Sequence, residues 1–121
     1  MMTEYARARR VGDLLKEELA DLILREVKDP RVGFLTLTAV EVSKDLKHAR
    51  VFFVTHEVEA AERTRSGLQS ASGYLRGALG RRLHLRHVPD LLFLFDTSLD
   101  HGMRINALLK ELAQDGEGHE S

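Results

Sequence analysis

Three histidines and two aspartates in the C-terminal half are the side chains whose types and spacing could bind a metal ion. His84 and His87 lie three residues apart, His101 follows further along, and Asp96 and Asp100 could add carboxylate oxygens. A metal site needs about three converging ligands held by a second shell of hydrogen bonds. Histidine also suits a helix C-terminus, where the helix dipole favours a cation, so we interpret residues 84 and 87 as helix-end residues and predict no metal ligands.

Catalytic chemistry has no recognisable motif in this sequence. There is no cysteine, which excludes a thiol nucleophile and a cysteine-bound zinc ion. Phosphate-binding loops, nucleophile elbows, metalloprotease helices and dinucleotide fingerprints are also absent. We therefore predict no catalytic residues and no cofactor, and we expect a protein that is not an enzyme.

Arginine is the side chain that points to a function. Residues 62–87 contain six arginines and one glutamate, whereas residues 88–121 contain two basic and seven acidic side chains, although the whole chain has a net charge of −1. The planar guanidinium group suits paired contacts to phosphate. Such asymmetry indicates an anionic partner on one face. The alternative is an ordinary solvated helix face.

Glycines interrupt the same region. Residues 58–84 repeat apolar side chains at helical spacing but include Gly67, Gly73, Gly77 and Gly80. Because each interior glycine costs a helix about 1 kcal/mol relative to alanine, we predict a break and a close approach to a partner there. The segment from Gly77 to Gly80 has the spacing of a GxxG nucleotide-binding loop, but its two central residues continue the apolar stripe and favour a helix. Tyr74 could stack on a base or pack in the core.

A second, smaller basic group lies near the N-terminus. Arg7, Arg9 and Arg10 precede the first apolar stripe. They could bind phosphate, or they could belong to a frayed, solvated start of the first helix.

Hydrophobic periodicity predicts the elements that position these side chains. Residues 7–27 form an amphipathic helix, which the Asp29-Pro30 pair ends. Residues 34–43 and 49–55 form an antiparallel hairpin, with Leu35, Leu37 and Ala39 on one face of the first strand. Residues 91–95 form a third strand, buried on both sides or central in the sheet.

Two further segments complete the prediction. Residues 101–113 have the apolar spacing of a last helix, and residues 114–121 are polar and form a short disordered tail. The element order predicts an α+β fold in which a three-stranded sheet carries its helices on one face. No apolar run approaches the roughly 18 residues that a membrane span needs.

Five short motifs in order resemble the bacterial ribosome-binding factor A family. The resemblance covers about residues 4–112. The motifs are Lys28-Asp29-Pro30-Arg31, Val42-Ser43-Lys44-Asp45-Leu46, Ala71-Ser72-Gly73-Tyr74-Leu75-Arg76, Leu85-Arg86 leading to Pro89-Asp90-Leu91, and Phe95-Asp96-Thr97-Ser98.

The resemblance implies a KH-like domain of the second type over residues 1–113, with helix-strand-strand-helix-kink-helix-strand order and a C-terminal helix. In such a domain an Ala-x-Gly kink replaces the GxxG loop, which places the break at Gly73. The RNA-binding residues that we predict from the basic groups and this resemblance are Arg7, Arg9, Arg10, Arg31, Ala71, Ser72, Gly73, Tyr74, Arg76, Arg81, Arg82 and Arg86.

The resemblance also implies a function. Members bind the free 30S ribosomal subunit, assist late maturation of 16S rRNA including its 5′ end, and matter for cold adaptation. An assembly GTPase helps their release in some bacteria. We expect a cytoplasmic monomer that binds neither DNA nor a membrane. The alternative that the element order leaves open is a small regulatory α+β domain that binds a metabolite or another protein through its sheet.

Overall fold

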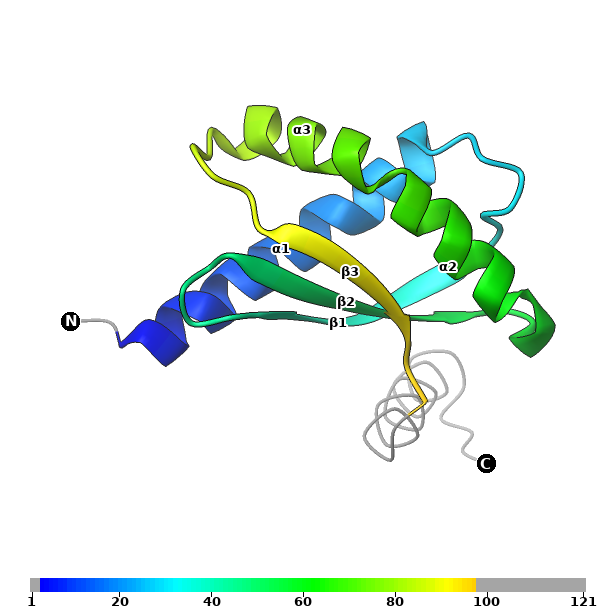
Figure 1. The fold of residues 1–121 in the computed structure, drawn as a ribbon, viewed down its shortest axis with the longest axis horizontal. Helices are drawn as coiled ribbons and strands as arrows, with labels where there is room; N and C mark the ends of the chain where they lie inside the picture. The colour runs from blue at the N-terminus through cyan, green and yellow to red at the C-terminus, as the bar shows by residue number, and fades with distance from the viewer. Residues whose placement is uncertain (1–2, 98–121) are drawn as a thin grey trace, which may run out of the picture.

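A computed structural model of the chain describes residues 3–97, which form an α+β fold, as predicted (Figure 1). The predicted helix over residues 101–113 and the tail over 114–121 lie outside the described residues. The elements in chain order are α1 (Glu4–Glu26), β1 (Leu35–Val42), β2 (His48–Thr55), the short 3₁₀ helix η1 (Val58–Ala60), α2 (Ala61–Ser70), α3 (Ser72–Leu83) and β3 (Asp90–Phe95).

Helix α1 starts three residues earlier than the apolar stripe predicted. The hydroxyl of Thr3 accepts a hydrogen bond from the backbone N–H of Ala6 at 3.0 Å, and so caps the helix N-terminus. The arginines at positions 7, 9 and 10 therefore lie within the helix rather than in a frayed segment before it.

The sheet has the strand order β1-β2-β3. Strands β1 and β2 pair antiparallel, and β3 pairs parallel to β2 after the chain has crossed through α2 and α3. The prediction that the third strand is central or buried on both sides is wrong, since β3 is an edge strand and Leu92 is 47% exposed. Gln69 of α2 covers this edge: its amide donates to the Leu91 carbonyl and accepts from the Phe93 N–H, both at 3.0 Å.

A bulge at Thr38 changes the face pattern of β1. Leu37 pairs with Phe53 and Ala39 pairs with Phe52, so Thr38 is the extra residue. Leu37 and Thr38 are both buried while Ala39 is half-buried, so the predicted common face of Leu35, Leu37 and Ala39 is wrong. The Thr38 hydroxyl donates to the buried carboxylate of Asp96 at 2.7 Å.

The core lies between one face of the sheet and the helices, which Figure 1 shows together on that side. Leucines of α1 and α3 meet the inward side chains of the strands, and Val51, Phe53 and Phe93 at the centre are fully buried. This packing fixes α1 and α3 beside one another, and with them the arginines that both helices carry.

Candidate nucleic-acid interface

The long glycine-containing segment is broken at Ala71, between α2 and α3. Ala71 has φ −88° and ψ 0°, outside the helical range, while its N–H donates to the carbonyls of Gly67 and Leu68 at 3.2 and 3.0 Å. The chain tightens for one residue and resumes as α3 at Ser72. The predicted break is therefore present, but two residues before Gly73, which belongs to the first turn of α3.

Gly73 faces open space. A Cβ built on this glycine meets nothing within 4 Å, so no packing inside the described chain requires glycine here. Gly73 is exposed, as is Tyr74 beside it, and Ser72 is half-buried. Gly73 is thus an exposed position without a side chain, the kind that another molecule can approach closely.

Tyr74 lies on the surface rather than in the core, because 52% of it is exposed. Its hydroxyl donates a hydrogen bond to the Glu26 carboxylate at the end of α1. That bond is the main cause that raises the pKa of the Tyr74 phenol. The alternative that Tyr74 packs in the core is wrong, and its stacking on a base stays a prediction.

Two of the predicted RNA-binding arginines hold the fold together. Arg82 of α3 pairs with Glu18 and Asp21 of α1 at 3.0 and 2.8 Å, which ties the two helices. Arg31 forms a paired contact with Asp29, 2.6 Å at its shorter arm, and also donates to Ser66 of α2 at 3.2 Å. The pKa of Asp29 is lowered to about 2, and the main cause is the hydrogen bond that it accepts from the Arg31 side chain.

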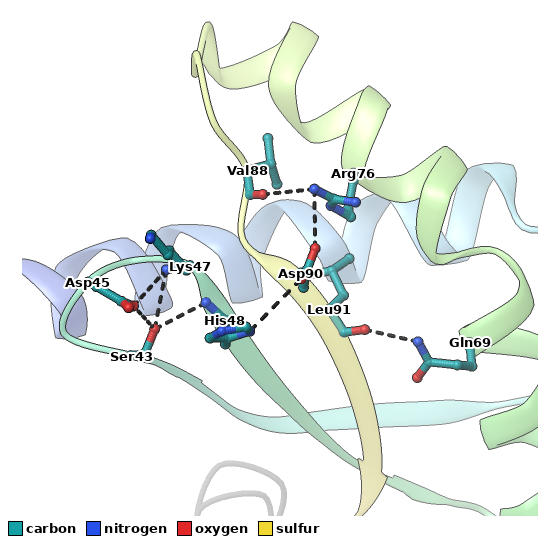
Figure 2. Close-up of polar contacts among 9 residues, drawn as sticks. All are labelled: Ser43, Asp45, Lys47, His48, Gln69, Arg76, Val88, Asp90 and Leu91. Atoms are coloured by element: carbon teal, nitrogen blue, oxygen red, sulfur yellow. Dashed lines mark hydrogen bonds and ion pairs between the residues drawn. The ribbon is translucent and has the colours of Figure 1, made fainter.

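Arg76 is partly committed as well. Its guanidinium donates to the Val88 carbonyl and lies 3.3 Å from an Asp90 carboxylate oxygen, as Figure 2 shows. The side chain remains 43% exposed, so it can still reach a ligand while it holds α3 against the start of β3.

Five of the predicted arginines are exposed and have no ion-pair partner among residues 3–97. They are Arg7, Arg9, Arg10, Arg81 and Arg86. Because their charge is not neutralised within the described chain, these side chains are the ones best able to attract a polyanion.

The predicted residues do not form a single patch. Arg7, Arg9 and Arg10 lie at the N-terminal end of α1, while Arg31 follows its C-terminal end, and the helix rise separates these groups by about 25 Å. The kink and Arg81 lie along α3 between them. Two cations absent from the predicted set, Lys44 and Lys47 of the β1–β2 turn, are also exposed. Their position within a predicted turn is the feature of the sequence that could have identified them as candidates.

A groove of about 850 Å³ lies between α1 and the first half of β1. It is mainly apolar, and Leu24 and Phe34 on its rim are 79% and 85% exposed. Within residues 3–97 no group of three or more histidine, aspartate or glutamate side chains is placed to hold a metal ion. No helix of that part is long and apolar enough to cross a membrane.

Comparisons with known proteins give one consistent result. A family model described as ribosome-binding factor A matches residues 7–109. A ribosome-binding factor A from Halothermothrix orenii is 51% identical over 112 residues, covering 92% of this chain and 92% of the relative. One from Thiobacillus denitrificans is 46% identical over 120 residues, covering 98% of this chain and 97% of the relative.

Solved structures agree with the sequences. The crystal structure of ribosome-binding factor A from Thermus thermophilus is 34% identical with a TM-score of 0.64, and covers 72% of this chain and 93% of that chain. A homology model of the Thermus thermophilus factor, fitted into a cryo-EM map of its complex with the 30S subunit, is 36% identical with a TM-score of 0.60. That match covers 71% of this chain and 91% of the other.

Proposed function

The chain belongs to the ribosome-binding factor A family, and from this membership we propose that it is a non-catalytic, RNA-binding assembly factor of the 30S ribosomal subunit. Its ligand is 16S rRNA in the free subunit, bound by a monomer in the cytoplasm. Residues 1–113 act as one RNA-binding domain.

The observation that carries this proposal is the set of exposed arginines that have no ion-pair partner among residues 3–97, which lie on α1, on α3 and in the loop after α3. Arg81 and Arg86 follow the break, and the α1 group lies at the N-terminal end of the neighbouring helix. Guanidinium groups without partners among residues 3–97 neutralise phosphates at little cost, because no ion pair has to be broken first. Gly73 lets an RNA backbone approach α3 without meeting a side chain.

The physical work of such a factor is differential binding. A protein that prefers one arrangement of flexible rRNA helices shifts their population toward that arrangement without making or breaking a bond. Late maturation of 16S rRNA, including processing of its 5′ end, then follows in the favoured arrangement. Misfolded RNA helices persist longer in the cold, so the need for the factor rises as temperature falls, and an assembly GTPase promotes its release.

Alanine substitution of Arg81 and Arg86 tests the proposal. The double variant should bind purified 30S subunits more weakly than the parent, and the slope of log affinity against log salt should fall by about two, one for each phosphate contact. A matched control is the double alanine variant of Lys28 and Arg63, two exposed cations near the opposite end of the molecule. Equal binding by all three proteins would refute the assignment of these arginines.

The regulatory-domain alternative would use the apolar groove between α1 and β1. A ligand of that groove would raise the thermal midpoint of the protein, and the purified protein would carry no nucleic acid. Co-purification of RNA, removed by high salt, is the result that the assembly-factor proposal predicts.

A further inference from the structure

The β1–β2 turn is held in a fixed shape by its own polar groups. The Ser43 hydroxyl donates to Asp45 at 2.6 Å and accepts from the backbone N–H groups of Lys47 and His48 at 3.2 and 3.1 Å (Figure 2). Asp45 also accepts from the Lys47 N–H at 3.0 Å, and Leu46 takes the left-handed φ of 63° that the turn requires. A turn bonded in this way needs little further ordering when it binds a partner.

The carboxylate of Asp45 in this turn already accepts hydrogen bonds from within the turn. The hydrogen bond from Ser43 is the largest cause that lowers the pKa of Asp45, followed by the backbone bond from Lys47. Lys44 and Lys47 are exposed and form no ion pair among residues 3–97, although the charge of Lys47 also contributes to the lowered pKa of Asp45. The turn therefore presents two unpaired cations on a rigid backbone.

The start of strand β3 links the turn to α3. The Asp90 N–H donates to the Lys47 carbonyl at 2.9 Å, and the Asp90 carboxylate lies between Arg76 at 3.3 Å and the His48 ring at 3.9 Å. Figure 2 shows this chain of contacts from the turn to α3. Arg86 lies four residues before Asp90, in the loop that enters β3. The turn thus neighbours the end of that loop, where it enters β3 at Asp90.

On its other side the turn faces the start of α1. A cavity of about 470 Å³ is lined by Tyr5 and Arg9 of α1 together with Lys44 and Arg50 of the hairpin. Arg9 of α1 and Lys44 of the turn therefore border the same hollow. The turn stands between the two groups of unpaired arginines that the proposed function uses.

We propose that Lys44 and Lys47 of the β1–β2 turn contact RNA and join the α1 arginines and Arg86 into one continuous phosphate-binding surface. The inference rests on the proposed function and adds residues to it that the arginine pattern does not include. Six cations on this surface lack a carboxylate partner among the described residues: Arg7, Arg9, Arg10, Lys44, Lys47 and Arg86.

The chemistry of this end favours RNA phosphates over an acidic protein. Protein interfaces have an apolar centre, and the strongly exposed apolar side chains Leu24, Phe34 and Val58 lie near the opposite end of the sheet. At the turn the exposed groups are charged, and the aromatic ring at this end, Tyr5, is 64% exposed and able to stack on a base.

A pair of double variants tests this inference. Lys44→Ala/Lys47→Ala removes the two turn cations, and Lys28→Ala/Arg63→Ala removes two exposed cations near the other end. Affinity is measured for purified 30S subunits and for protein-free 16S rRNA over a series of salt concentrations. We expect the turn variant to bind both 30S subunits and 16S rRNA roughly 10-fold more weakly than the parent. The slope of its log affinity against log salt should fall by about two, while the control keeps the affinity and slope of the parent.

The remaining outcomes separate the two proposals. If the parent binds subunits and the turn variant binds equally well with the same slope, the turn is not a contact and only this inference falls. If the turn variant loses 30S binding but keeps rRNA binding, its partner is a ribosomal protein, which also overturns it. If the parent binds neither 30S subunits nor 16S rRNA, the proposed function itself fails. Lys44→Arg/Lys47→Arg should restore binding, and unchanged circular dichroism and thermal midpoints establish that each variant folds.

Discussion

Gly12 of α1 lies directly against the backbone carbonyl of Val40 in β1. A Cβ built on Gly12 would stand 2.6 Å from that oxygen, closer than real carbon atoms come. The obstacle is backbone, which cannot rotate away as a flexible side chain can. The absence of a side chain at position 12 therefore sets how closely α1 approaches the sheet.

Gly12→Ala should destabilise the protein. Alanine gains about 1 kcal/mol of helix propensity over glycine. The clash, however, forces α1 away from β1, and overpacking of this kind costs roughly 1–3 kcal/mol, which we expect to outweigh that gain. Urea denaturation measures the net loss in the free energy of unfolding. A variant as stable as the parent would show that α1 can shift without cost.

Gly73→Ala should separate stability from function. The added methyl group meets nothing within 4 Å, so the variant gains roughly 0.5–1 kcal/mol of stability from helix propensity. If RNA approaches this backbone closely, the same variant binds 30S subunits more weakly. Gly33→Ala is the control for affinity, since its Cβ also meets nothing within 4 Å and it lies outside α2 and α3, and it should keep the affinity of the parent.

Arg81 and Arg82 are adjacent but should respond in opposite ways. Arg82→Ala breaks the contacts to Glu18 and Asp21, so it should lower the thermal midpoint, whereas Arg81→Ala should leave it unchanged. Binding to 30S subunits should weaken in the Arg81 variant. Equal thermal midpoints for the two variants would contradict the role of Arg82 in tying α3 to α1.

The Asp29–Arg31 pair gives a prediction in pH. The Asp29 pKa is lowered from 3.8 to about 2, so the folded state binds this proton less readily than the unfolded state. The pair therefore stabilises the protein fully above about pH 4, and this stabilisation is lost as pH falls toward 2. Carboxyl NMR titration should give a midpoint near 2 in the parent and one closer to the ordinary value in Arg31→Ala. A midpoint near the ordinary value in the parent would contradict the contact.

Local sequence patterns were enough to predict most of the fold. Helix α1, the hairpin and the broken α2–α3 segment follow from apolar spacing and from Asp29-Pro30, which are properties of neighbouring residues. The position of β3 at the sheet edge was not predictable in this way. Its run of apolar side chains is equally consistent with a central strand, and Gln69, which covers that edge, comes from α2, 22 residues away along the chain.

The candidate site was less predictable than the fold. Arginine content indicated a polyanion, but nothing local distinguishes Arg82, which pairs across 61 and 64 residues with α1, from Arg81, which has no ion-pair partner in the described part of the chain. The bulge residue Thr38 finds its hydrogen-bond partner in Asp96, 58 residues later. The lysines of the β1–β2 turn gain significance only once β3 and α1 are placed beside them.

Co-sedimentation of the purified protein with free 30S subunits, 50S subunits and whole ribosomes at low and high salt tests the central claim most directly. The claim predicts binding to free 30S subunits alone, with a steep loss of affinity as salt rises, because phosphate contacts release counterions. Absence of binding to 30S subunits at low salt, or binding that does not change with salt, would contradict it.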